Sequence, residues 1–284
     1  MRQRRRGERV DVTRRRLVVG MGAAGFALAA GPVSAQVIMT PSEGLITADH
    51  KVRSGAESIP VYEARPSAAG RHPVVIVIHE IFGLHEHQRD VARRFAREGY
   101  VALAPDLFAR EGVAQMSDFG KVREVVGKIS DRQVLQDLAA VAAFARQQLY
   151  ARADRVGATG YCWGGRITWL LAATDKNLKA AVAWYGRILS PQKDDLHPKD
   201  PLDLAGEMAC PVLGLYGEED TGIPVADVRK MEAALKEAGK TAEVVVYPGA
   251  PHAFFADYRP SYRPEAAKDA WQRALNWFAR YLKA

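Results

Sequence analysis

The fold is decided by one stretch of ten residues, Val156-Gly157-Ala158-Thr159-Gly160-Tyr161-Cys162-Trp163-Gly164-Gly165. An apolar run typical of a buried strand passes directly into a segment with helical spacing, and glycines lie two residues before and after Cys162. Glycine is favoured on such a turn because larger side chains would clash with the strand and the helix. The turn raises its central side chain above the sheet and aims the next backbone N–H at a developing oxyanion. Cys162 is therefore a candidate nucleophile; a small structural cysteine is the alternative.

Outward from this turn, short apolar runs alternate with longer segments of helical spacing. The runs predict buried strands at 74–78, 100–104, 155–161, 179–184, 212–216 and 243–247. The helical segments are 86–98, 131–150, 163–174, 224–238 and 264–282, and residues 45–65 predict an antiparallel hairpin at one edge. This alternation predicts an α/β fold of one domain, with a mostly parallel central sheet and helices on both faces. The longer connections, 105–130 and 186–209, are where we expect a substrate pocket.

Two partners for Cys162 follow it in the chain. Asp220 comes just after the predicted strand 212–216, and His252 lies on the loop after the strand 243–247. Where a nucleophile lies on a strand–helix turn of this kind, the acid and then the base follow in that order. Taken singly, Asp220 could be an acid at a helix start and His252 a loop histidine that caps a carbonyl. Together, each at the end of a strand, they predict a Cys-His-Asp triad.

These residues resemble the motifs of the dienelactone hydrolase (carboxymethylenebutenolidase) family of α/β-hydrolases. The likeness rests on Gly160-Tyr161-Cys162-Trp163-Gly164-Gly165, Gly217-x-x-Asp220 and Gly249-x-x-His252. Upstream, His79-Glu80-Ile81-Phe82-Gly83-Leu84 resembles the family's Glu-Ile-Phe-Gly turn, and Pro105-Asp106-Leu107-Phe108-Ala109-Arg110 resembles its Pro-Asp-Leu-Tyr-Ala-Arg. The resemblance covers about residues 42–283 and implies an α/β-hydrolase fold.

The resemblance also implies an activity, the hydrolysis of small esters or lactones through a thioester. By this resemblance Cys162 is the nucleophile, His252 the base and Asp220 its orienting acid. Glu80 is an extra carboxylate that holds the resting thiol and helps to generate the thiolate when substrate arrives. The remaining assignments are an oxyanion hole formed by the N–H groups of Ile81 and Trp163, and Arg110 as the residue that receives a substrate carboxylate.

One departure from the family pattern leaves the substrate open, and an alternative pairing leaves the role of Glu80 open. The family's reference enzymes carry a second substrate-binding arginine four residues after the catalytic histidine, where this chain has Ala256. A carboxylate clamp therefore loses one of its two cations, unless Arg259 or Arg263 replaces it from nearby. A broader carboxylesterase is one alternative, and a non-catalytic or redox-sensing scaffold of the same fold is another. Glu80 could also be a structural acid paired with Arg89 or Arg93.

Composition limits the partners of the chain. The 284 residues are 48% hydrophobic and 26% charged, an ordinary balance that excludes disordered, collagen-like and coiled-coil classes. The formal charge is +7, yet residues 1–35 hold eight arginines against two acids, which leaves 32 basic and 31 acidic residues in 36–284. The expected partner is a small ester or lactone, anionic if Arg110 binds a carboxylate, and not a nucleic acid.

The basic N-terminus predicts an export signal. Thr13-Arg14-Arg15-Arg16-Leu17-Val18 is followed by an uncharged run over 17–30 and by small residues that end at Ala35. This pattern resembles a twin-arginine signal cut after Ala35, and it predicts a periplasmic domain over 36–284. We expect no stable membrane insertion after export and a monomer. An uncleaved anchor and a disordered leader are the alternatives.

Neither a disulfide nor a metal is expected. Cys210 begins a predicted strand whereas Cys162 follows the end of one, so in a parallel sheet the two lie at opposite edges. Cys210 should be a packed structural thiol. His85 and His87 have no third ligand at a suitable spacing, so the sequence predicts no metal and no cofactor.

Overall fold

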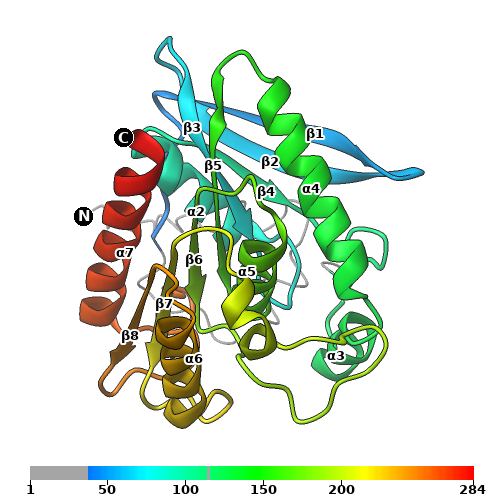
Figure 1. Ribbon diagram of the computed structural model, residues 1–284. Coiled ribbons are helices and arrows are strands. Elements are labelled where there is room, and N and C mark those ends of the chain that lie inside the picture. Colours follow the sequence, from blue (N-terminus) through cyan, green and yellow to red (C-terminus); the bar gives the residue numbers. More distant parts are fainter. Residues whose placement is uncertain (1–37, 114–115) are drawn as a thin grey trace, which may run out of the picture.

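The computed structural model describes residues 38–113 and 116–284, so the predicted signal over 1–35 lies outside the described residues. Its centre is one eight-stranded sheet in the order β1-β2-β4-β3-β5-β6-β7-β8 (Figure 1). The strands are β1 (Leu45–Ser54), β2 (Glu57–Pro66), β3 (His72–Ile78), β4 (Val101–Pro105), β5 (Ala151–Tyr161), β6 (Ala180–Trp184), β7 (Val212–Gly217) and β8 (Ala242–Tyr247). β1 and β2 run antiparallel at one edge, and the strands from β4 to β8 are parallel, as predicted.

Helices cover both faces of the sheet. They are α2 (Glu86–Arg97), α3 (Phe119–Val126), α4 (Asp131–Gln147), α5 (Trp163–Thr174), α6 (Val225–Glu237) and α7 (Pro264–Phe278). α4, α5 and α6 lie on one face, and α2 and α7 lie on the other (Figure 1). The ring of Phe95 on α2 lies 4.6 Å from that of Trp271 on α7, so these two helices pack together. The doubly covered sheet confirms the predicted α/β architecture.

Burial explains why the central strands were recognisable. In β3, Val74 to Ile78 are all fully buried, because helices pack on both faces of the strand. Continuous apolar runs, rather than alternating ones, are the signature of such strands. The two short elements that the sequence did not indicate are α3 and the 3-10 helix Pro201–Glu207, and both lie in the predicted long connections.

The parallel strands bring several loops to one edge of the sheet. Ile78 at the end of β3 pairs with Gly160 near the end of β5, and Gly217 at the end of β7 pairs with Tyr247 at the end of β8. The segments that follow these strands therefore leave the sheet from the same edge. The candidate catalytic residues that the sequence indicates lie on these segments.

Both cysteines are free thiols, as expected. Cys210 is buried, and its burial raises the pKa of its thiol to about 12. In the described part of the chain no helix is long and apolar enough to cross a membrane.

Candidate active site

The turn between β5 and α5 holds Cys162 in a left-handed backbone conformation, with φ of 56° and ψ of −114°. Two glycines make the turn possible. A Cβ on Gly160 would lie 2.2 Å from the Gly164 carbonyl oxygen, and one on Gly164 would lie 2.5 Å from that of Ile78. The Cys162 N–H donates to the Trp184 carbonyl at 3.0 Å, which fixes the turn against β6. The side chain is partly exposed at the helix start, where the dipole favours an anion.

His252 and Asp220 meet beside this turn. The Nδ1 of His252 lies 2.5 Å from Asp220 Oδ2, and Asp220 also accepts backbone hydrogen bonds from Gly222 at 2.9 Å and Ile223 at 3.1 Å. Asp220 is only 4% exposed, so these bonds fix the orientation of the imidazole. The acid and the base predicted from chain order are therefore paired in space.

The charge on His252 depends on Cys162. Burial opposes the cation, but electrostatic attraction to Cys162 and hydrogen bonds with Asp220 and Cys162 outweigh it, and the pKa of His252 rises to about 10. The structure thus brings Cys162, His252 and Asp220 to one place. All three line a cavity of about 510 Å³ at the carboxyl edge of the sheet.

The two residues predicted to form the oxyanion hole lie at the same cavity. Ile81 follows β3 and Trp163 is the first residue of α5, and both line the cavity. Neither N–H donates a hydrogen bond to another described residue. The first N–H groups of a helix have no partner within it, so they are available to an anion. Two such free backbone N–H donors are what an oxyanion hole requires.

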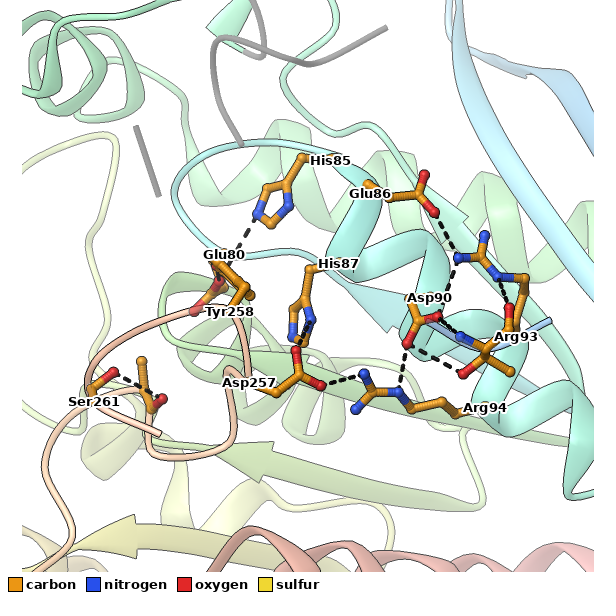
Figure 2. Close-up of polar contacts among 12 residues, drawn as sticks. Glu80, His85, Glu86, His87, Asp90, Arg93, Arg94, Asp257, Tyr258 and Ser261 are labelled. Carbon is orange, nitrogen blue, oxygen red and sulfur yellow. Dashed lines mark hydrogen bonds and ion pairs between the residues drawn. The ribbon is translucent and has the colours of Figure 1, made fainter. Parts of the chain in front are cut away.

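Glu80 lies beneath the cavity rather than in its wall. It is 1% exposed, and its Oε2 accepts a hydrogen bond from the Tyr258 hydroxyl (Figure 2). Its Oε1 lies 3.7 Å from Nη1 of Arg259. The alternative pairing with Arg89 or Arg93 is wrong, because those arginines pair with other acids. The sequence missed Tyr258 and Arg259 as the residues that hold Glu80.

A buried ionic network fastens the loop after His252 to α2 (Figure 2). Asp257 is fully buried, with Oδ2 2.5 Å from Arg94 and Oδ1 3.5 Å from His87. Arg94 also binds Asp90 at 2.6 Å. Burial disfavours the Asp257 carboxylate, but His87 and Arg94 outweigh it and lower the pKa of Asp257. The same short loop therefore holds Glu80 through Tyr258 and is itself anchored by Asp257.

Arg110 is not among the described residues that line the cavity. Its guanidinium forms a bidentate pair with the buried Asp137, at 2.7 and 3.0 Å, and a further pair with Glu57. These hydrogen bonds, with Asp137 foremost, raise the pKa of Arg110. The structure thus places Arg110 in an ion-pair cluster away from Cys162, and its predicted role as the receiver of a substrate carboxylate gains no support from its position.

Other arginines line the cavity instead. Arg166 on α5 is held by Asp131 in a bidentate pair at 2.6 and 2.8 Å. Arg123 on α3 and Arg187 after β6 are exposed, and neither has a carboxylate within 4.0 Å in the part of the chain that the structure describes. Arg123 and Arg187 lie in the two long connections where a pocket was expected, which was the one sequence signal that could have located them.

The sheet order and the nucleophile turn define the α/β-hydrolase fold. The model of the "Dienelactone hydrolase family" matches residues 59–282, and the chain belongs to this family. The predicted enzyme class, a hydrolase of carboxylic esters or lactones, is confirmed at the level of the family.

Similar proteins carry consistent names. A "Putative carboxymethylenebutenolidase" of Methylorubrum extorquens is 50% identical over 273 residues, which cover 95% of this chain and 94% of that protein. One of Escherichia coli K12 is 47% identical over 262 residues, which cover 90% and 95%. A crystal structure of a "Putative Dienelactone Hydrolase from Klebsiella pneumoniae subsp. pneumoniae MGH 78578" is 50% identical, with a TM-score of 0.81 over 84% of this chain and 99% of the other.

Proposed function

We propose that the protein hydrolyses small esters or lactones with Cys162 as nucleophile, His252 as acid and base, and Asp220 as the acid that orients His252. The observation that carries the proposal is the convergence of these side chains in one cavity, with His252 between the carboxylate and the sulfur. A relative of Bradyrhizobium, 34% identical over 231 residues covering 81% of this chain, is named "Probable 2-oxo-3-(5-oxofuran-2-ylidene)propanoate lactonase", which agrees with a lactone substrate.

The reaction follows from the geometry. The thiolate of Cys162 attacks the carbonyl carbon, and the amides of Ile81 and Trp163 stabilise the oxyanion, each donor being worth about 3 kcal/mol. The carbon–oxygen bond then breaks, and His252 gives its proton to the leaving oxygen. A water attacks the thioester, returns a proton to His252 and releases the acid together with the thiolate.

Glu80 is proposed as a supporting carboxylate that favours formation of the thiolate. Its Oε2 accepts a hydrogen bond from Tyr258, whereas its Oε1 forms only an ion pair with Arg259, at 3.7 Å. Burial opposes the Arg259 cation, but Glu80, Tyr258 and Cys162 together raise the pKa of Arg259. Arg259 therefore lies in the field of both Glu80 and the sulfur. For Glu80 to act on Cys162 it would have to leave these partners when substrate arrives.

The decisive experiment uses the two thiols as a matched pair. Cys162→Ala should abolish hydrolysis of p-nitrophenyl acetate without unfolding the protein, and iodoacetamide should inhibit the wild type. Cys210→Ala should stay active and stay sensitive to iodoacetamide, because the Cys210 thiol is buried with a raised pKa. Wild-type turnover by Cys162→Ala would exclude the mechanism. A folded wild type without esterase activity would favour the scaffold alternative.

We also propose that residues 1–35 direct export to the periplasm. The support is the order of a basic region, an uncharged run over 17–30 and small residues before Ala35. Replacing Arg15 and Arg16 by lysine should retain the protein in the cytoplasm, as measured by cell fractionation. The same replacement at Arg4 and Arg5 is the control and should leave export unchanged.

A further inference from the structure

Three residues other than glycine have a left-handed backbone among the residues that the structure describes. They are Cys162, Ala253 and Tyr185, with φ of 56°, 59° and 37°. The first is the proposed nucleophile, and the second directly follows the proposed base, His252. Such conformations are unfavourable for residues with a Cβ, and they cluster at functional sites. Tyr185 is the one of the three that has no role so far.

The surroundings of Tyr185 explain its conformation. Its N–H donates to the Leu215 carbonyl at 2.8 Å at the end of β6. The next residue, Gly186, packs so closely on the first turn of α5 that a Cβ there would lie 2.3 Å from the Gly165 carbonyl carbon. The chain must therefore turn sharply at Tyr185, and the turn places the tyrosine in the wall of the cavity that holds Cys162.

Among the residues that the structure describes, the hydroxyl of Tyr185 has no hydrogen-bond partner. Tyr185 is 1% exposed, and no described residue forms a hydrogen bond with its Oη. Burial, with Glu80 as the next cause, raises the pKa of Tyr185 well above its usual range, so the hydroxyl keeps its proton and can donate. Buried polar groups are almost always satisfied, and an exception in a cavity wall calls for a partner that enters the cavity.

The position of the ring indicates what that partner is. The ring of Tyr185 lies edge-on to that of His252, with centroids 5.2 Å apart. Because Nδ1 of His252 is engaged by Asp220, Nε2 is the nitrogen that exchanges protons with the thiol and the substrate. Tyr185 therefore lies beside the imidazole that would pass a proton to the leaving oxygen.

We propose that Tyr185 is a further catalytic residue, whose hydroxyl donates a hydrogen bond to the leaving-group oxygen of the substrate. The inference rests on the proposed function of Cys162 and His252. As the carbon–oxygen bond breaks, its electron pair goes to the leaving oxygen, which takes its proton from Nε2 of His252. Tyr185 keeps its own proton and stabilises the charge that develops on that oxygen.

The test compares two acetate esters that differ in leaving group, with kcat/KM as the measurement. Tyr185→Phe should lower kcat/KM for phenyl acetate by about 10- to 30-fold, the worth of one hydrogen bond to a developing charge. For p-nitrophenyl acetate the loss should be under about 3-fold, because its leaving group disperses the charge itself. Unfolding in urea should show no loss of stability, since the hydroxyl has no partner to lose.

Tyr100→Phe is the matched control. The hydroxyl of Tyr100 is also buried without a hydrogen bond to a described residue. Its ring, however, packs against Phe95 and Phe278 at the start of β4, at the opposite edge of the sheet. This variant should match the wild type with both esters. Equal losses with both esters, no loss with either, or a destabilised Tyr185→Phe would overturn the inference. Failure of the proposed function would appear separately, as turnover by Cys162→Ala.

Discussion

At the scale of single residues, the charge of His252 is set by its two partners. Burial disfavours the imidazolium, but electrostatic attraction to Cys162 and the hydrogen bond with Asp220 outweigh that cost and raise the pKa of His252 to about 10. A proton held this firmly is available to a leaving oxygen over the whole neutral range. A protonated His252 beside Cys162 can therefore act as the proposed general acid toward the leaving oxygen.

Cys162→Ala should lower the pKa of His252 from about 10, because burial then opposes the cation and Asp220 alone favours it. The measurement is an NMR titration of the imidazole nitrogens in the wild type and the variant. Cys210→Ala should leave the titration unchanged, since its sulfur lies elsewhere. An unaltered titration in Cys162→Ala would contradict the contact between His252 and Cys162.

The sequence could indicate Cys162, Asp220 and His252 because each directly follows a recognisable strand, and chain order then assigns the roles. It could not indicate Tyr185, whose position in the cavity depends on a backbone turn that Gly165 and Gly186 impose. Nor could it place Arg110, because its partner Asp137 lies on α4, far along the chain. Local patterns reveal which residues end strands, whereas ion pairs depend on how distant elements pack.

At the scale of elements, the active site depends on how closely α5 approaches the end of β6. A Cβ on Gly165 would lie 2.4 Å from the Trp184 carbonyl oxygen and 2.9 Å from the Cα of Gly186. A Cβ this close to backbone atoms would clash with them, and only a shift of the helix could relieve the clash. The turns that carry Cys162 and Tyr185 are therefore held in one relative position by this contact.

Gly165→Ala should destabilise the protein by about 1–3 kcal/mol and lower kcat/KM, because the helix start must shift away from β6. Urea unfolding and hydrolysis of p-nitrophenyl acetate measure the two effects. Gly206→Ala is the control: its added Cβ would meet the Ala238 side chain at 3.9 Å, an ordinary contact. If Gly165→Ala had the same free energy of unfolding as the wild type, α5 would be able to move away from β6 without loss of stability.

The anchoring of the loop after His252 gives a prediction with a pH dependence. Asp257→Asn should destabilise the protein by about 3–5 kcal/mol, because it breaks a buried ion pair and leaves Arg94 with one carboxylate fewer. The pKa of Asp257 is lowered below its ordinary 3.8, since His87 and Arg94 outweigh the effect of burial. Its contribution to stability is therefore present above that pH and lost as the pH falls through the folded pKa.

Urea unfolding of Asp257→Asn and of the wild type tests this at pH 7 and at pH values below 3.8. The difference in the free energy of unfolding between the two proteins should become smaller at the acidic pH values. Asp49→Asn removes the pair between Arg89 on the same helix and the exposed Asp49 on β1, and should cost at most about 1 kcal/mol. Equal small losses in both variants would mean that the loop needs no ionic anchor.

Elements were predictable to different degrees. The central strands stood out because both of their faces are covered, so their sequences are apolar without interruption. α5 begins and ends at the predicted residues, Trp163 and Thr174, since a glycine turn precedes it. α3 and the 3-10 helix Pro201–Glu207 could not be found, because each is short and buries few side chains.

At the scale of the whole molecule, most of the net positive charge and the cavity that holds Cys162 come from different parts of the chain. The formal charge of +7 comes mostly from residues 1–35, so the domain is nearly neutral. A preference for anionic substrates must therefore come from residues close to the cavity. Arg123 and Arg187 supply such a local field, because they line the cavity and have no carboxylate partner among the described residues.

Replacing both Arg123 and Arg187 by glutamine should raise KM for p-nitrophenyl hydrogen succinate by about 3- to 10-fold, the worth of hydrogen bonds from partly solvated cations to a carboxylate. KM for its neutral methyl ester should stay unchanged, because that ester offers no negative charge. The preference of the wild type for the anionic ester should also weaken as salt is added.

Arg110→Gln separates this arrangement from the one that the sequence resemblance implies. Arg110 is already bound to Asp137 and Glu57, so its loss should lower stability by about 1–3 kcal/mol while the ratio of KM values for the two esters stays that of the wild type. The opposite result would be a ratio of KM values that changes in Arg110→Gln and not in the double variant of Arg123 and Arg187. Arg110 would then have to leave Asp137 and Glu57 when substrate binds, and the anion site would be the one that the family motif predicts.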